Sequence, residues 1–528
     1  MNLSELSAME QIGFPLLSLI IFFPAVAALL IRLVGDTAAP KLAVIVSAVQ
    51  LALTVFAWWV YDPAAGGLQL TENISSLPYR LGVDGISIMF IPATALLTLL
   101  AVVYARNSVK ENLPGYLMAL LLCEAALIGA FAASNLILFW VFFVVELFPS
   151  YYLIKAWGST EKRTESASNY MKFMAVAALA LGVGFVAMAT SVADGTSFAI
   201  ADIAQQGIPA SAQGPIFFAL CLGFAIKAPL FPLHTWLPKV LEHGPIIGMS
   251  VFLVGIKLGA YGLIRFVIPL LPEATAQWFW LMAALGFASM VYGALVALVQ
   301  TNLRRLLAYA SISHLGVVTL GFFSLTSAGI EGGILQALSL GITGAGLFLI
   351  ASFISARIEN PDLANMGELQ SRAPLLGLSF LVIALAAVGM PGTSGFNGEH
   401  LVLLGAFEKH WLMALCVAVG PIFAAAYFLR YYQKAFLGAS SGDETETMAD
   451  LSSRERGILM SLVAIVLLMG LYSTPFISTM RSNAEEIATI FGATKEDHAA
   501  VVLPVETDLW SASADVNQIG ATVRGKQP

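Results

Sequence analysis

Long apolar runs recur along almost the whole chain, and they constrain its fold more than any other feature. The 528 residues are 58% hydrophobic and only 11% charged, whereas a soluble domain carries about 25% charge. Since one bilayer crossing needs roughly 20 apolar residues, the sequence predicts an all-α polytopic membrane protein with about 14 transmembrane helices. The runs lie near 13–33, 42–61, 85–105, 115–132, 134–155, 171–191, 214–232, 247–269, 276–299, 306–323, 332–354, 374–408, 411–436 and 456–477.

The distribution of lysine and arginine predicts the orientation, because cytoplasmic loops are enriched in both residues. Loops after even-numbered spans hold only Arg80, Arg265 and Lys409. We therefore expect the loops after odd-numbered spans to face the cytoplasm and both termini to lie on the periplasmic side or its equivalent. The loops after odd-numbered spans are much richer, with Arg32, Lys41, Arg106, Lys110, Lys155, Lys162, Arg163, Lys172, Lys239, Arg304, Arg305, Arg357, Arg372, Arg430, Lys434, Arg454 and Arg456.

Two spans carry sequences that interrupt a helix. Span 7 contains Pro229, Pro232 and Pro238, and span 12 contains the segment 389–399 with Pro391 and several glycines. Proline removes a backbone donor and breaks a helix, and paired interruptions in corresponding halves are typical of inverted-repeat transporters. We therefore predict two inverted five-helix repeats, spans 4–8 and 9–13, with broken helices 7 and 12.

This reading divides the chain into five parts. The N-terminal spans 1–3 occupy 1–112, and the two repeats occupy 113–270 and 271–437. A loop and span 14 follow over 438–478, and a polar tail covers 479–528, in which one short helix is an open alternative.

Charged residues inside the apolar runs are the main functional signal. Glu146, Lys227, Lys257 and Glu399 each lie in a run long enough to span, and a charge at bilayer depth costs at least about 2.5–3.5 kcal/mol. A lysine in a poorly hydrated interior releases its proton more readily, whereas a nearby carboxylate keeps it charged. These residues are therefore candidates for proton transfer, with Glu146 and Lys227 as a switchable pair. The alternative is that the charges pair only to lock helices together.

Other buried polar residues extend this hypothesis. His234 and His314 are candidate relays, because an unperturbed histidine changes its charge near pH 6.5, or else structural hydrogen-bonding groups. Glu124 is a further charge in an apolar run, for which pairing with Lys155 is one interpretation.

The sequence predicts no cofactor or metal site in this chain. Cys123, Cys221 and Cys416 lie singly in apolar runs, with no Cys-x-x-Cys or Cys/His cluster for zinc or an iron–sulfur centre. The formal net charge of −7 argues against a nucleic-acid partner. The expected surroundings are the lipid bilayer and other membrane subunits.

The sequence resembles the antiporter-like subunits of respiratory complex I, which are related to Mrp antiporters, and it is most similar to the M type with its D and chain 4 counterparts. The glutamate in broken span 12 favours the M type, because most sister subunits have a lysine there. The resembling stretches are the Glu146 segment with Trp157 and Gly158, then Phe224–Pro238, Lys257–Phe266, Asn302–Tyr309, His314–Gly316, Met366–Leu369 and Gly389–Gly405.

The resemblance implies a proton-translocating membrane-arm subunit of an NADH–quinone oxidoreductase, with L-, N- and K-like subunits as partners and the redox centres elsewhere. It implies that Glu146 pairs with Lys227, that Lys257 links the two halves, and that Glu399 gates the last half-channel. One residue departs from the pattern: Leu340 stands where the M type has a histidine, and Ser339 with water is a candidate substitute.

Three alternatives remain open at the level of the sequence. The chain can belong to an Mrp-type cation/proton antiporter, or to a divergent complex such as a carbon-uptake form. It can also be a scaffold with an inactive channel, which the missing histidine favours. A quinone-binding subunit is a weaker alternative, because a quinone pocket and ordinary aromatic packing look alike in a sequence.

Overall fold

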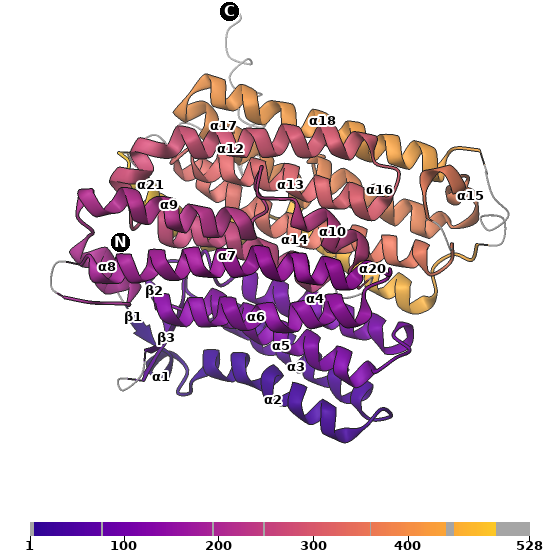
Figure 1. Cartoon of the computed structure of the whole chain (residues 1–528), viewed down its shortest axis with the longest axis horizontal. Coiled ribbons are helices and arrows are strands. Elements are labelled where there is room, and N and C mark those ends of the chain that lie inside the picture. The colour runs from indigo at the N-terminus through magenta and orange to yellow at the C-terminus, as the bar shows by residue number, and fades with distance from the viewer. Residues whose placement is uncertain are drawn as a thin grey trace, which may run out of the picture. The chain divides into compact units, whose positions relative to one another are not determined.

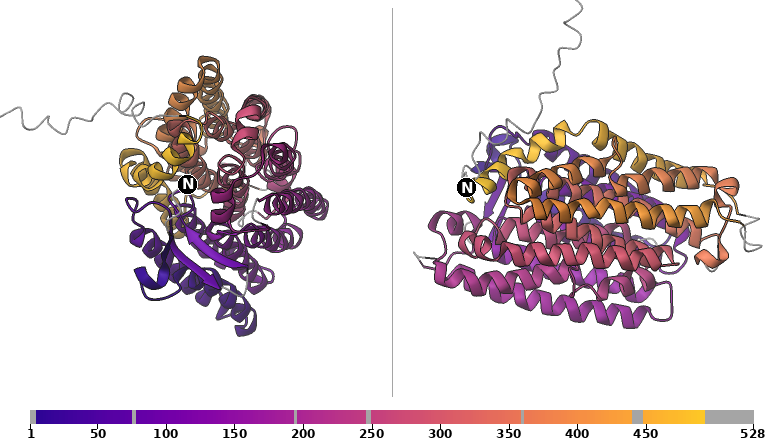
Figure 2. Two further views of the ribbon diagram at one scale, coloured as in Figure 1. Left: turned by 90° about the vertical axis from the view of Figure 1, so that its left-hand side faces the viewer. Right: turned by 90° about the horizontal axis from the view of Figure 1, so that it is seen from above.

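The computed structural model describes residues 5–74, 78–192, 195–245, 249–358, 361–439 and 448–492. Residues 1–491 belong to one packed unit, in which long helices run side by side (Figures 1 and 2). The polar tail begins within the helix α21 (Thr474–Thr489), so a short helix at its start is confirmed. From residue 493 on, the tail lies outside the described residues.

Over the described ranges, 11 helices are long and apolar enough to cross a membrane, or 12 if the bent pair α20 (Ser453–Leu471) and α21 is one span. An all-α polytopic fold is thereby confirmed. The remaining predicted spans coincide with shorter or broken helices, so the count of about 14 stays a prediction. The 11 helices are α2 (Leu16–Val34), α3 (Ala39–Val60), α4 (Phe90–Ser108), α5 (Leu113–Ala132), α6 (Leu136–Trp157), α7 (Arg163–Thr190), α9 (Ala210–Lys227), α12 (Pro272–Val299), α13 (Leu303–Phe322), α14 (Ser327–Ser355) and α18 (Trp411–Phe436).

Both predicted breaks are present. The helix α9 ends at Lys227, and the chain resumes as α10 (Trp236–His243) after the segment that holds Pro229 and Pro232. Span 12 divides into α16 (Pro374–Val388) and α17 (Ser394–Lys409). Gly389 and Gly392, between these two helices, have φ of +85° and +84°, a conformation that glycine adopts at little cost.

Helix pairing repeats itself in the two halves of the chain. In the first half α5 packs on α6, α6 on α7, α7 on α9 and α9 on α11 (Met249–Gly262), which returns to α5. In the second half α12 packs on α13, α13 on α14, α14 on α16 and α17, and α17 on α18, which returns to α12. The same closed cycle of five supports the predicted repeats, whereas their inversion and boundaries stay predictions.

A small sheet, which the sequence analysis did not anticipate, lies near the start of the chain. The strand β2 (Leu68–Ile74) pairs in parallel with β1 (Glu5–Ser7) and antiparallel with β3 (Tyr79–Val83). Glu72 of β2 accepts hydrogen bonds from the backbone N–H groups of Leu17 and Ser18 at the start of α2. Burial raises the pKa of the Glu72 carboxyl above its ordinary value, and these bonds oppose that shift.

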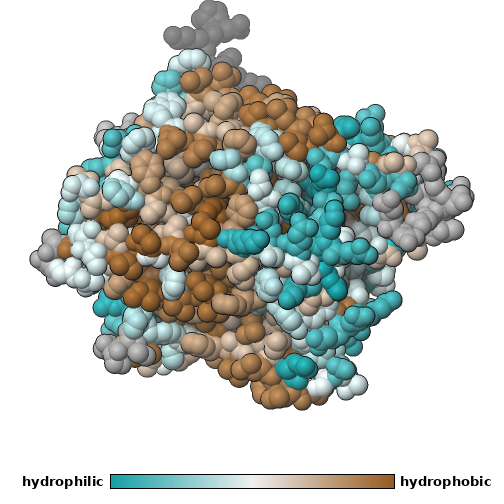
Figure 3. All heavy atoms as spheres, viewed as in Figure 1, coloured by the Kyte–Doolittle hydropathy of each residue, from teal (hydrophilic) through white to brown (hydrophobic). Residues whose placement is uncertain are grey.

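The outer surface matches a membrane protein. A broad region of hydrophobic residues covers the middle of the visible face, and hydrophilic residues gather towards the side where α15 (Leu369–Arg372) lies (Figures 1 and 3). Large apolar side chains such as Leu33, Trp59 and Leu471 are 76–80% exposed, which is costly in water but neutral against lipid tails. The remaining short elements are α1 (Ala8–Gln11), α8 (Ile200–Gln206), the π-helix η1 (Leu263–Val267) and the 3₁₀ helix η2 (Leu363–Asn365).

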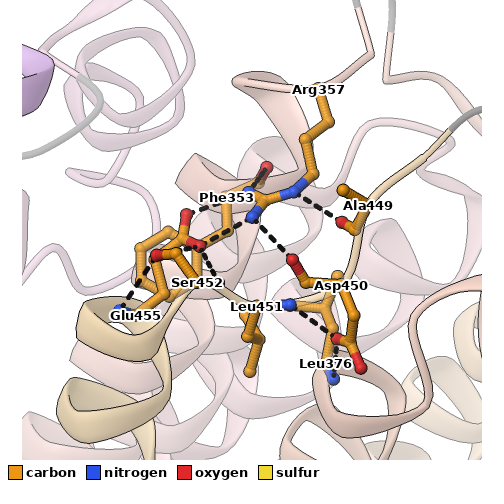
Figure 4. Close-up of polar contacts among 8 residues, drawn as sticks. All are labelled: Phe353, Arg357, Leu376, Ala449, Asp450, Leu451, Ser452 and Glu455. Carbon is orange, nitrogen blue, oxygen red and sulfur yellow. Dashed lines mark hydrogen bonds and ion pairs between the residues drawn. The ribbon is translucent and has the colours of Figure 1, made fainter.

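Arg357 ties the end of α14 to the start of α20 (Figure 4). Its guanidinium donates to both carboxylate oxygens of Glu455, at 2.9 and 2.6 Å, and to the backbone oxygens of Ala449 and Asp450. Glu455 also completes a capping box with Ser452. A two-pronged guanidinium–carboxylate pair has fixed geometry, so Arg357 joins these helices in addition to its predicted role in orientation.

Candidate functional site

Glu146 and Lys227 form a buried ion pair between α6 and the broken end of α9. The Lys227 Nζ atom lies 2.6 Å from Glu146 Oε2, and the two side chains are 2% and 1% exposed. The Ser150 hydroxyl, one turn along α6, donates to Glu146 Oε1 at 2.6 Å. Lys227 is the last residue of α9, where the negative end of the helix dipole favours a cation. The break in span 7 therefore places the Lys227 ammonium group within ion-pair distance of the Glu146 carboxylate.

Lys257 lies on α11 and is 2% exposed. Among the described residues, its Nζ atom has no acidic group within ion-pair distance. It lines a cavity of about 20 Å³ together with His314, Thr343 and Leu340. That volume holds roughly one water molecule. Lys257 and His314 therefore face one space that a single water molecule can fill.

His314 and Glu399 meet beside the second break. His314 Nδ1 lies 3.9 Å from Glu399 Oε1, and its Nε2 lies 3.0 Å from the Tyr427 hydroxyl. Gln336 donates to the same Glu399 oxygen at 3.0 Å. The distance of 3.9 Å exceeds a hydrogen bond but permits a bridging water. Gly389 gives this carboxylate room, because a Cβ there would lie 2.2 Å from Glu399 Oε2.

Leu340 lines the cavity beside Lys257, at the position where the M-type histidine was expected. Ser339 is absent from the cavity lining, and its hydroxyl lies 2.7 Å from that of Ser394 at the start of α17. The hydroxyl of Thr343 donates to the Ser339 carbonyl. The structure therefore does not place Ser339 where it could substitute for the M-type histidine. A water molecule in the cavity is what can connect Lys257 to His314.

His234 lies apart from these clusters. It is 3% exposed, and its ring packs near Phe231, Tyr292 and Tyr309 at centroid distances of 5.7, 4.8 and 6.5 Å. Its Nδ1 atom has no hydrogen-bond partner in the described part of the chain. The relay role of His234 stays a prediction, since no contact joins it to Lys227 or Lys257.

The site residues form two clusters: the Glu146–Lys227 pair, and the group Lys257, His314 and Glu399. The helix α11 lies between them, because a Cβ at Gly255 would be 3.3 Å from Glu146 Oε1, and Gly255 is two residues before Lys257. Among the described residues, no hydrogen bond or ion pair joins one cluster to the other. The separation fits a pathway in which a conformational change or water joins two segments.

Three buried charged residues were counted with the loops or were not singled out. Arg265 was counted as a loop residue, but it is 3% exposed within η1 and pairs with Asp84, which was not singled out. Arg304 likewise is 7% exposed and donates to Ser159 and the Gly244 carbonyl. The signal available for Asp84 was its position between apolar residues directly before a span.

Glu124 is fully buried, and neither carboxylate oxygen has a hydrogen-bond partner among the described residues. The suggested pairing with Lys155 is wrong, because the Lys155 ammonium lies over the Tyr151 ring at 5.6 Å. An uncompensated carboxylate at such depth is very costly, so Glu124 is best accommodated as a neutral acid.

The described residues contain no group of three or more His, Cys, Asp or Glu side chains able to hold a metal ion. Cys123 and Cys221 are buried free thiols, and Cys416 is a partly exposed one. The prediction that this chain holds no cofactor remains a prediction.

Five-helix cycles, broken helices and charges buried at the breaks define an antiporter-like membrane subunit. A family model described as "NADH:quinone oxidoreductase/Mrp antiporter, TM" matches residues 133–424. The chain is 36% identical over 478 residues to the NADH-quinone oxidoreductase subunit M of Rhodobacter capsulatus, covering 87% of this chain and 93% of the relative. It is 32% identical to the subunit M of Rickettsia bellii over 498 residues, covering 91% and 100%. The chain belongs to the NADH:quinone oxidoreductase/Mrp antiporter family.

Solved structures agree with this assignment. A chain of respiratory complex I from Thermus thermophilus superposes with a TM-score of 0.82 at 30% identity, covering 90% of this chain and 100% of that chain. The Mrp complex from Dietzia sp. DQ12-45-1b superposes with a TM-score of 0.77 at 22% identity, covering 91% and 100%. The second likeness establishes the fold alone.

Proposed function

We propose that this chain is a proton-translocating membrane-arm subunit of an NADH–quinone oxidoreductase complex. The observation that carries the proposal is the Glu146–Lys227 ion pair at the break of span 7, which is 2.6 Å long and almost completely buried. The second broken helix brings Glu399 towards His314. Its relatives of similar length are named subunit M of this enzyme.

In this proposal the ion pair works as a switch. While the pair is closed, Glu146 keeps Lys227 protonated, because removing either charge from such a pair costs about 3–5 kcal/mol. When the pair opens, the ammonium in a poorly hydrated interior favours release of its proton. Lys257 receives that proton, and His314 and Glu399 pass it on through the cavity that Leu340 lines.

We infer that the redox centres and the quinone site lie in other subunits, and that L-, N- and K-like subunits adjoin this chain in the membrane arm. We also propose a bacterial cytoplasmic membrane or a thylakoid-type membrane, with both termini on the periplasmic or lumenal side. The asymmetric distribution of lysine and arginine in the loops supports this orientation.

The test is proton pumping by the purified complex in proteoliposomes, with quinone reduction measured in parallel. Lys227→Ala and Glu399→Ala are expected to lower pumping sharply while the complex still assembles. Normal pumping by both variants would favour an inactive scaffold.

An Mrp-type cation/proton antiporter is the second candidate, because the matching family model covers both groups and Leu340 departs from the M-type pattern. Co-purification decides between them. The first proposal predicts subunits with iron–sulfur clusters in the purified complex. The second predicts proton transport that depends on a sodium gradient without an electron donor.

A further inference from the structure

A polar vestibule opens at the lysine- and arginine-rich end of the molecule, between the loops α4–α5 and α6–α7. It has a volume of about 330 Å³, and its lining includes Lys110, Glu111, Tyr116, Trp157 and Arg163. Trp157 donates to the Glu111 carbonyl, and Arg163 donates to the carbonyl of Ala156 at the end of α6 and to that of Gly158 just after it. The rim is therefore fixed by its own hydrogen bonds around a space for several water molecules.

The seam between α5 and α6 leads from this vestibule into the membrane. The rings of Tyr116 and Trp157 lie 5.2 Å apart at its outer end. Cys123 and Ser150 are each seven residues further in, and their side-chain atoms lie 3.5 Å apart. Seven residues are two turns, or about 10.5 Å, so both helices keep the same faces together. From Ser150, one hydrogen bond of 2.6 Å reaches Glu146.

The helix α7 adds a third side to the seam. Tyr170, seven residues after Arg163 of the vestibule, is fully buried on α7, which packs against α6, and its hydroxyl has no hydrogen-bond partner among the described residues. The Tyr116 hydroxyl is buried and has no hydrogen-bond partner among the described residues, although it belongs to a residue that lines the vestibule. Buried polar groups normally have a partner, and water from the vestibule is the available one.

We propose that Tyr116, Cys123, Ser150 and Tyr170 line the route by which protons reach Glu146 from the lysine- and arginine-rich side. This inference rests on the proposed function. A hydroxyl both donates and accepts a hydrogen bond. Ser150 therefore passes its proton to Glu146 and takes one from the outer side in the same exchange, and no group is consumed. The four residues are positioning residues, and they deliver protons to Glu146.

The experiment measures proton pumping by the assembled complex in proteoliposomes from pH 6 to 9. Ser150→Ala and the double variant Tyr116→Phe/Tyr170→Phe are expected to lower pumping by about tenfold, which is less than the loss of a full acid–base group. The loss grows as pH rises, because proton supply then limits the rate. Ser150→Thr, which restores a hydroxyl, recovers pumping. Tyr61→Phe removes another buried, unpartnered hydroxyl, away from the seam, and leaves pumping unchanged.

Glu146→Gln in the same assay separates the two levels of the proposal. If this variant loses pumping while the seam variants behave like Tyr61→Phe, the route is overturned and the proposed function stands. If Glu146→Gln pumps normally, both are overturned.

A second measurement needs no variant. Cys123 lies on the seam, and Cys221 is a similarly buried free thiol on α9. A small water-soluble methanethiosulfonate reagent is expected to modify Cys123 faster than Cys221, as read by mass spectrometry of the intact complex. Equal rates would show that the seam is dry and would overturn the route.

Discussion

Neutralising the Glu146–Lys227 pair should separate its contribution to stability from its contribution to transport. Lys227→Met leaves the Glu146 carboxylate at 1% exposure, with the Ser150 hydroxyl as its one remaining hydrogen-bond partner among the described residues. Breaking a buried ion pair in this way costs about 3–5 kcal/mol. The double variant Lys227→Met/Glu146→Gln removes both charges and keeps similar volumes. We expect it to recover most of that loss, because neutral replacement of a buried pair is often close to neutral in free energy.

Two assays read the two effects. Thermal unfolding of the purified complex should rank the double variant near the parent and well above Lys227→Met. Proton pumping in proteoliposomes, followed with a pH-sensitive dye during quinone reduction, should be lost in both variants, because neither retains the exchangeable pair. A stable complex that does not pump is the expected outcome for the double variant.

Asp84 and Arg265 provide a matched control, since their side chains are each 4% exposed and form an ion pair at the end of span 8. Asp84→Asn/Arg265→Met keeps a side-chain oxygen for the backbone N–H groups that Asp84 accepts from. We expect a similar stability pattern with pumping retained. The reasoning is refuted if Lys227→Met/Glu146→Gln pumps like the parent, or if both double variants lose pumping equally.

Three further predictions concern the broken helix and its surroundings. Leu340→Phe should fill the cavity of about 20 Å³ that Leu340 lines, and proton pumping should fall. The more polar variant Leu340→His should keep pumping at the parent level. Gly389→Ala should destabilise the complex and disturb pumping, since its Cβ would meet Glu399 at 2.2 Å. Gly392→Ala has an almost identical φ, but its Cβ would make only an ordinary contact, at 3.6 Å from the Leu471 side chain. Its cost in thermal unfolding should therefore be the left-handed backbone term of about 1–2 kcal/mol. Arg357→Lys loses the two-pronged bond to Glu455 at the start of α20. This loss should lower the unfolding temperature and leave the number of protons pumped per electron unchanged. An unchanged unfolding temperature would contradict the role of Arg357 in joining α14 to α20.

Local chemistry explains why much of the fold was predictable. Each apolar run transfers favourably into lipid by itself, so most of the long spanning helices follow from composition within one segment. Prolines and glycines act on their own backbone, so the breaks after Lys227 and Val388 were also readable. The sheet of β1, β2 and β3 was not, because its strands are short and β1 pairs with a strand more than 60 residues further along the chain.

The candidate site divides in the same way. The sequence identified Glu146, Lys227, Lys257, His314 and Glu399, because a charged or titratable residue within an apolar run is exceptional. The sequence did not reveal that Asp84 pairs with a buried arginine, since both residues lie at span ends where solvent exposure is the usual state. It also suggested a partner for Glu124 that the structure does not provide.

The sequence alone determined that long segments favour lipid, where two of them break and which ionisable groups are carried into the membrane, because each depends on the chemistry of a short stretch of chain. Only the tertiary structure decided which groups meet. Lys227 and Glu146 are 81 residues apart, Gln336 and Glu399 are 63 apart, and Tyr427 and His314 are 113 apart. Helix packing sets these distances. It also left the Glu124 carboxyl without a hydrogen-bond partner among the described residues and placed Leu340 against the cavity beside Lys257.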